Sequence, residues 1–174
     1  DEPCSKESAG NGDAIDDLLA GHVPRVTAEP HGGRSTLAPL PRLLLPGSFN
    51  PVHDGHLRLA HVAEDWLGSP LSFEISVTNV DKPPLEASTI RARLQQFAGA
   101  RPVELTRAPT FVEKARIFPG ATFVIGADTA VRLFVAKYYG GEAPMHAALD
   151  EIMALGSRFL VAVRADSSGR LLSL

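Results

Sequence analysis

The 174-residue sequence lacks the features that mark secreted, membrane or nucleic-acid-binding proteins. Its single cysteine, Cys4, cannot form an internal disulfide, which fits a reducing cytoplasm. No apolar run is long enough to cross a membrane, and the start, DEPCSKESAGNGD, does not have the pattern of a signal peptide. The net charge of -3 gives no overall basic field for nucleic acid. We therefore expect a cytoplasmic protein with neither a nucleic-acid nor a membrane partner.

Residues 1–41 predict an arm in front of the main domain. Residues 1–12 are polar, and residues 13–21 predict a short helix that begins at Asp13 and ends at Gly21. Four prolines and a Gly-Gly pair in residues 22–41 favour a linker or surface arm, compatible with fusion to an upstream domain. The chain does not begin with Met, so we expect a piece of a longer protein.

Residues 42–174 alternate between strand and helix patterns. Strands are expected at 42–45, 71–77, 102–107, 121–127 and 158–164, and helices at 56–68, 88–99, 110–118, about 129–139 and 144–155. This alternation predicts the α/β class, with a Rossmann-like doubly wound parallel sheet of about five strands in the order 3-2-1-4-5. Ligands of such sheets bind beyond the carboxyl ends of the strands, here between strands one and four.

Three local patterns refine the expected helices. Leu59, Val62, Ala63, Trp66 and Leu67 form one apolar face of the first helix of the domain, which we expect to pack on the core. Ser88 is the expected cap of the second helix. Thr110 and Glu113 have the spacing of a capping box at the start of the third.

The turn after the first strand of the domain, PGSFNPVHDGH (46–56), has the composition of an anion site. Gly47 permits a sharp turn and a close approach by a ligand, and Gly55 lies at a helix start, where N–H groups attract anions. His53 and His56 fall on one side of the first helical turn and could donate hydrogen bonds to phosphate. The alternatives are a metal pair or simple packing. No third Cys or His has matching spacing, so we expect no metal held by the protein.

These residues also resemble a known family. GSFNPVHDGH is similar to the His-x-Gly-His signature of the nucleotidylyltransferase superfamily, and most similar to its nicotinamide-nucleotide adenylyltransferase branch. VDKPPL (80–85), followed by Arg91 and Arg93, resembles that branch's lysine loop and arginine-bearing helix, and residues 123–139 resemble its Gly-x-Asp segment. The resemblance implies transfer of a nucleotidyl group from a nucleoside triphosphate to a phosphate-bearing acceptor, with pyrophosphate released and Mg²⁺ as the usual cofactor.

The resemblance also implies site residues. His53 and His56 would hold the triphosphate, with His56 nearest the α-phosphate. The implied nucleotide-binding residues are Gly47, Ser48, Phe49, Gly55, Gly126, Asp128 and Lys82, to which Arg164 is added as a cation at the end of the fifth strand. Asp128 would accept hydrogen bonds from sugar hydroxyls, but it is also the expected N-cap of the helix at 129. Lys82 could equally be a solvated loop lysine.

The superfamily's second signature, a Ser/Thr-rich turn before an Arg-bearing helix, is not matched. DSSGR (166–170) instead predicts a hairpin. Either the signature follows Leu174 in a longer chain, or the protein lacks it and binds nucleotides without turning them over. Two hypotheses therefore stand: a nucleotidylyltransferase of adenylyl or cytidylyl type, acting on a mononucleotide or similar acceptor, and a non-catalytic nucleotide-binding module of a larger or fused protein. A thiol enzyme using Cys4 is a weaker third, since no base lies near it in the sequence.

Overall fold

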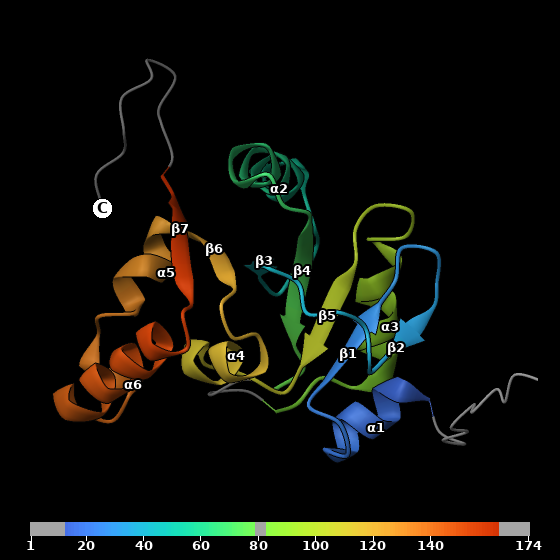
Figure 1. Ribbon diagram of the computed structural model, residues 1–174. Helices are drawn as coiled ribbons and strands as arrows, with labels where there is room; N and C mark the ends of the chain where they lie inside the picture. Colours follow the sequence, from blue (N-terminus) through green and yellow to red (C-terminus); the bar gives the residue numbers. More distant parts are fainter. Residues whose placement is uncertain (1–12, 79–82, 164–174) are drawn as a thin grey trace, which may run out of the picture.

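A computed structural model describes residues 13–78 and 83–163 of the chain. The described strands form one seven-stranded sheet in the order β2-β1-β5-β4-β3-β6-β7, which Figure 1 shows from β2 at one edge to β7 at the other. The strands are β1 Arg25–Ala28, β2 Arg34–Ser35, β3 Leu43–Pro46, β4 Leu71–Ser76, β5 Val103–Thr106, β6 Thr122–Gly126 and β7 Arg158–Ala162. The helices are α1 Ala14–Ala20, α2 Asp54–Leu67, α3 Ala87–Gln95, α4 Phe111–Ile117, α5 Ala127–Arg132 and α6 Glu142–Ala154, with a short 3₁₀ helix at Ala136–Tyr138.

The sheet is mostly parallel, which places the chain in the α/β class with a Rossmann-like arrangement. Parallel pairing joins β3 to β4 and β6, β4 to β5, and β6 to β7. The predicted count of five strands and the order 3-2-1-4-5 are wrong for the sheet as a whole. The sheet has seven strands because the antiparallel strands β1 and β2 extend it beyond β5.

The expected linker at residues 22–41 is therefore wrong at 25–28 and 34–35. All four residues of β1 are buried, although Arg25 and Thr27 are polar. Arg25 Nη1 donates to Glu104 Oε2 at 3.0 Å and to Thr27 Oγ1 at 2.8 Å, and its Nη2 contacts the carbonyl oxygen of Ala38. Proline and charge in the segment suggested a solvated arm, but pairing inside the fold satisfies that charge.

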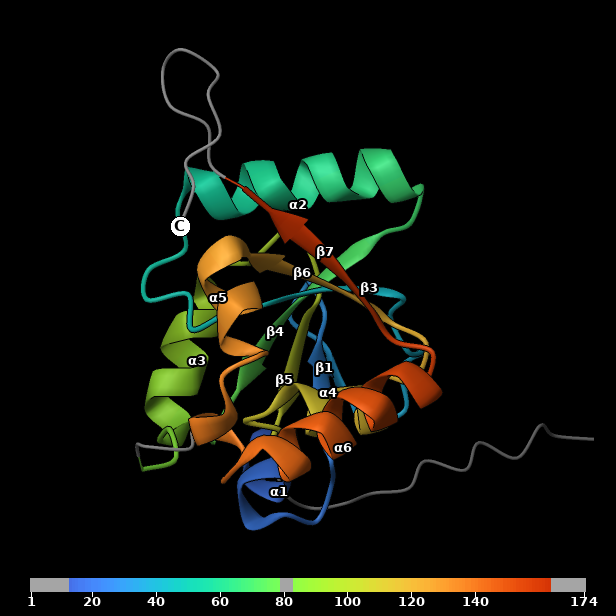
Figure 2. The same ribbon diagram turned by 90° about the vertical axis from the view of Figure 1, so that its left-hand side faces the viewer.

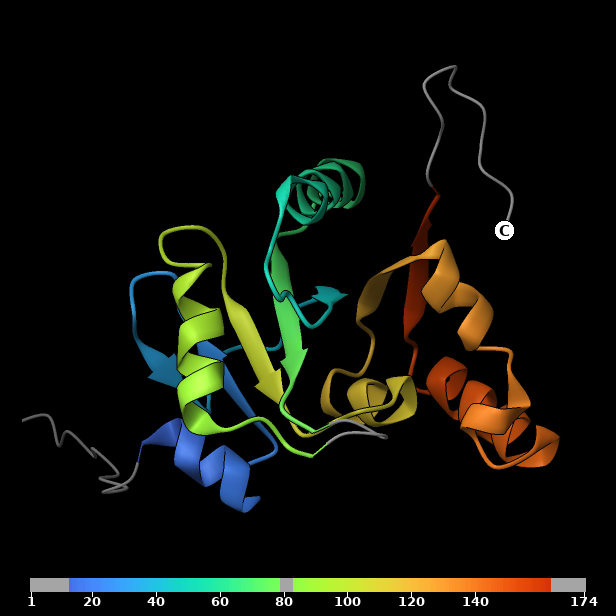
Figure 3. The same cartoon turned by 180° about the vertical axis from the view of Figure 1, so that it is seen from behind.

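The helices cover both faces of the sheet. On one face α1, α2 and α3 contribute Ile15, Leu18, Ala60, Ala63 and Ile90 to the larger core; on the other, α4 and α6 contribute Ala115 and Ile152 to the smaller. Viewed from behind, α3 covers the side of the sheet that carries β1 and β5 (Figure 3). The second view shows α4 and α6 side by side, in agreement with their contacts (Figure 2).

The helix ends test the predicted caps. Asp13 and Gly21 cap α1, and the capping box of Thr110 and Glu113 begins α4, so both predictions are confirmed. The cap predicted at Ser88 is wrong, since α3 begins after Glu86.

The predicted apolar face of α2 is only partly buried. Ala60 and Ala63 are fully buried, so this helix approaches the core through small residues. Val62 is 54% exposed and Trp66 is 72% exposed, which corrects the expectation that the whole face packs on the core. None of the helices in the described ranges is both long and apolar enough to cross a membrane.

Replacing Glu104 by alanine should lower the stability of the part of the sheet that β1 and β2 form. Arg25 would then lie buried without a counter-charge, which costs about 3–5 kcal/mol of unfolding free energy. Urea denaturation measures the loss, and Glu151→Ala is the control, because Glu151 pairs with Arg116 on the exposed surface. Equal losses in the two variants would contradict a buried role for the Arg25–Glu104 pair.

Candidate functional site

The turn from β3 to α2 is built around the ring of Phe49. Phe49 is 2% exposed and has a positive φ of 43°, and its ring meets those of Phe73 at 5.1 Å and Phe97 at 5.4 Å, both edge to face. A Cβ on Gly47 would lie 2.7 Å from this ring. Gly47 is therefore required by the packing of Phe49, a reason different from the predicted sharp turn and ligand approach.

The two predicted histidines lie together at the start of α2. His53 is the N-cap residue, and the rings of His53 and His56 stack with centroids 3.7 Å apart and planes 24° apart. A Cβ on Gly55 would lie 3.0 Å from the His53 ring, and the φ of Gly55 is not positive. Gly55 thus leaves room for His53 to stack on His56.

His56 is held in one orientation by the backbone. Its Nδ1 accepts a hydrogen bond from the backbone N–H of His53 at 3.3 Å, and its ring lies edge to face with Phe49 at 5.0 Å. In neutral His56 the hydrogen must therefore reside on Nε2. Burial lowers the pKa of His56, and the nearby charge of His53 lowers it further. At neutral pH the ring is thus a single hydrogen-bond donor through Nε2.

Side chains at the C-terminal end of α3 form hydrogen bonds with backbone groups of the same turn. Arg93 Nη1 donates to the carbonyl oxygen of Ser48 at 2.9 Å. The side-chain amide of Gln96, just after the helix, donates to the carbonyl oxygen of Phe49 at 3.1 Å and accepts from the N–H of Val52 at 2.8 Å. Gln96 was not predicted for this site, because a glutamine beside an amphipathic helix carries no signal of its own.

A cleft of about 280 Å³ opens at the carboxyl ends of β3 and β4, where ligands of doubly wound sheets bind. Its lining is Pro46, Gly47, Ser48, Glu74, Ser76, Leu85, Arg93, Pro109, Phe111, Lys114 and Thr129. Gly47 and Ser48 were predicted for this site. Glu74 and Lys114 were missed, since nothing in a strand or helix pattern distinguishes a buried ion pair from solvated charges.

The remaining predicted residues are placed differently. Gly126 is the N-cap of α5, and no atom lies within 4 Å of a Cβ built on it, so its backbone is open to approach. Asp128 is exposed in the first turn of α5 and is not the N-cap, which corrects that interpretation; its neighbour Thr129 lines the cleft. Lys82, Arg164 and the hairpin predicted at 166–170 lie outside the described residues.

The side chains of the site do not form a metal centre in the part of the chain that the structure describes. Within residues 13–78 and 83–163, no group of three His, Cys, Asp or Glu side chains is arranged to hold an ion.

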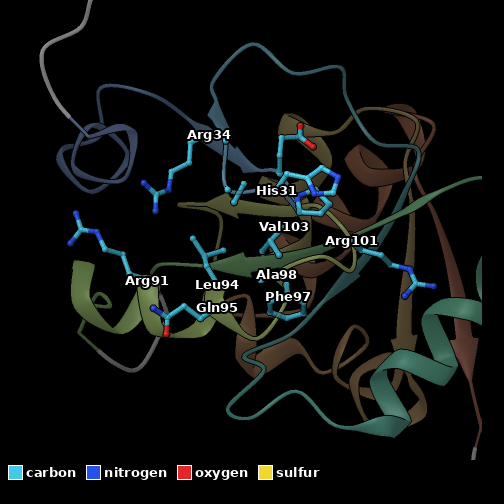
Figure 4. Close-up of a pocket in the computed structure, with 14 residues that line it drawn as sticks. His31, Arg34, Arg91, Leu94, Gln95, Phe97, Ala98, Arg101 and Val103 are labelled. Atoms are coloured by element: carbon cyan, nitrogen blue, oxygen red, sulfur yellow. The ribbon is translucent and has the colours of Figure 1, made fainter.

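A second cavity, of about 440 Å³, lies between the β1–β2 hairpin and α3 (Figure 4). It reaches Val103, the first residue of β5, and so opens at the amino end of that strand. Its arginines are paired: Arg34 and Arg91 with Asp13, and Arg101 with Glu64. The smaller cleft is the better candidate, because it adjoins the histidine turn and lies at the carboxyl edge.

The chain matches a model of a known protein family. A family model described as Cytidylyltransferase-like matches residues 44–157, more than half of the chain. The chain belongs to the cytidylyltransferase-like family. This family is part of the nucleotidylyltransferase superfamily. Membership of the family implies a nucleotidyltransferase. No curated protein matches the chain in sequence.

Gln96→Ala should loosen the turn without disturbing the core. The variant loses both hydrogen bonds that Gln96 makes to the turn, about 1 kcal/mol each, so the affinity for a nucleoside triphosphate should fall on the order of tenfold. Isothermal titration calorimetry measures it, with Gln95→Ala as the matched control, because Gln95 is adjacent and lines the other cavity. If the two variants bind alike, α3 does not position the turn.

Proposed function

We propose that the protein transfers a nucleotidyl group from a nucleoside triphosphate, ATP by its resemblance to the nicotinamide-nucleotide adenylyltransferase branch, to a phosphate-bearing acceptor such as a mononucleotide. The observation that carries the proposal is the stacked pair of His53 and His56 at the N-terminus of the 14-residue helix α2. The helix N-terminus supplies backbone N–H groups for an anion, and His56 adds a side-chain donor.

The proposed reaction needs no protein nucleophile. An oxygen of the acceptor's phosphate attacks the α-phosphorus of the triphosphate, the new P–O bond forms, and the bond to the β-phosphate oxygen breaks, so that pyrophosphate leaves. His56 Nε2–H would donate to an oxygen of the α-phosphate, where charge develops. His53, stacked on His56, would support that ring and contact the same phosphate chain. The protein's remaining contribution to catalysis is the positioning of the two reactants.

The alternative is a nucleotide-binding module without turnover. Pyrophosphate release separates the two functions. The full chain is incubated with ATP or CTP, Mg²⁺ and a panel of mononucleotides, and pyrophosphate is measured. Acceptor-dependent release supports transfer, and its preference between ATP and CTP identifies the nucleotide donor. Triphosphate binding without release supports the module.

His56→Asn should lower the rate of pyrophosphate release by about 100-fold while keeping the melting temperature within a few degrees. Asparagine can still accept from the His53 N–H, but it has no group at the position of Nε2, and removing one such donor costs about 10²–10³ in rate. His61→Ala is the control, since His61 is exposed on the same helix and pairs only with Asp65. An unchanged rate in a folded His56→Asn would refute the phosphate role.

Triphosphate affinity should rise as the pH falls below about 6.5. Because the pKa of His56 is lowered, the ring is neutral at pH 7 and gains its proton only below the ordinary histidine value, and the cationic ring binds an anion more tightly. The affinity is measured from pH 8 to pH 5. The same series in His56→Asn is the control for the pH dependence that the titration of the triphosphate itself contributes. Parallel curves for the two proteins would contradict the prediction.

A further inference from the structure

The larger cavity, of about 440 Å³, has an apolar lining between the β1–β2 hairpin and α3. It opens at the amino end of β5, whereas the histidine turn follows the carboxyl end of β3. Leu94 and Ala98 contribute from α3 and the segment after it, together with Phe97 and Val103, which are only 2% and 1% exposed (Figure 4). A cavity of this volume with apolar walls is in the range of small-molecule sites.

The charged residues around this cavity are mainly cationic. Among the described residues that line it, Arg34, Arg91 and Arg101 are cations, and the exposed Glu29 is the one carboxylate. Arg101 donates through Nε and Nη2 to the two carboxylate oxygens of Glu64, at 3.0 and 2.6 Å, and its side chain is directed away from the other two arginines (Figure 4). The guanidinium groups of Arg34 and Arg91 instead are directed toward each other at the opposite end of the cavity (Figure 4).

These two arginines share one carboxylate, and they share it unequally. Arg91 Nη2 donates to Asp13 Oδ2 at 2.6 Å and lies 3.8 Å from Asp16 Oδ1, so carboxylates of the α1 segment neutralise Arg91. Arg34 Nη1 reaches Asp13 Oδ1 only at 3.5 Å, the outer limit of a hydrogen bond. Since a guanidinium has five N–H donors, Arg34 keeps donors for a further anion. The same carboxylates repel a second negative charge, so a singly charged group fits this end best.

We propose that this cavity is a binding site for a small organic carboxylate with an apolar body, separate from the cleft beside the histidine turn. The fork of N–H groups on Arg34 matches the two oxygens of a carboxylate, which lies between Arg34 and Arg91. The apolar body of the ligand covers Leu94, Ala98 and the accessible edge of Phe97. The site thus combines one charged anchor with apolar contact area, and it does not depend on nucleotide binding in the cleft.

The test compares two compounds that differ in one group. 2-Naphthoate carries a carboxylate where 2-naphthamide carries an uncharged carboxamide on the same ring system. Each is titrated into the full chain labelled with ¹⁵N, and NMR spectra give the dissociation constant and the amides that shift. We expect the carboxylate to bind about tenfold more tightly, because hydrogen bonds to an ionised acceptor are about twice as strong as neutral ones. The shifts should fall in residues 29–34 and 91–98. Equal binding, binding of neither compound, or shifts confined to the 46–56 turn overturns the inference.

Arg34→Gln tests the anchor. Glutamine removes the cation, so the affinity for 2-naphthoate should fall about tenfold while that for 2-naphthamide stays the same. Arg116→Gln is the matched control, because Arg116 is also an arginine paired with a carboxylate, that of Glu151, on the exposed surface away from the cavity. An unchanged preference for the carboxylate in a folded Arg34→Gln overturns the inference.

Ala98→Trp tests the cavity without changing its charge. The indole would occupy the space over the apolar lining, so both compounds should lose binding. Ala100→Trp is the control, since Ala100 is likewise exposed, lies two residues further on and does not line the cavity. Wild-type affinity for 2-naphthoate in a folded Ala98→Trp overturns the inference. If one of the two variants does not fold, the other decides together with the position of the NMR shifts.

Discussion

The packing of Phe49 is the constraint on which the geometry of the candidate site depends. Its ring lies against Phe73 of β4, Phe97 after α3, and His56 of α2, so one side chain joins the sheet to both helices beside the turn. The backbone accepts a positive φ to bring the ring into the core. Because the ring lies under Gly47, it also dictates the glycine there. Core packing thus accounts for Phe49 and Gly47 in this turn.

The parts of the fold that follow from local patterns were predictable. The five parallel strands and the caps of α1 and α4 depend on residues close in sequence, and the expected patterns hold for them. The strands β1 and β2 were not predictable, because β1 pairs with the distant strand β5 and its buried Arg25 has its counter-charge on Glu104, 79 residues away. Proline frequency describes the local chain and contains no information about such a distant partner. The exposed face of α2 was mispredicted for a similar reason: periodicity identifies an apolar side but not what covers it.

For the candidate site, the sequence identified the residues of the turn and missed those that surround it. His53 and His56 belong to one short motif, and Arg93 was marked by the resemblance, whereas Glu74, Gln96 and Lys114 lie far apart in the sequence and only the fold brings them together. Glu74 and Glu104 also look like solvent-facing positions of alternating strands. In a sheet covered on both faces those positions are interior, and their charges require partners. A charged residue in a central strand is therefore a reason to search for its partner.

The charged and polar residues around the cleft form two groups with different roles. The Glu74–Lys114 pair ties α4 to β4 at the carboxyl edge, and because it is neutral and buried it holds the cleft in shape without attracting phosphate. Under the proposed function, phosphate would be attracted instead by Arg93, by the N-terminus of α2 and by the histidines, all of which adjoin the turn.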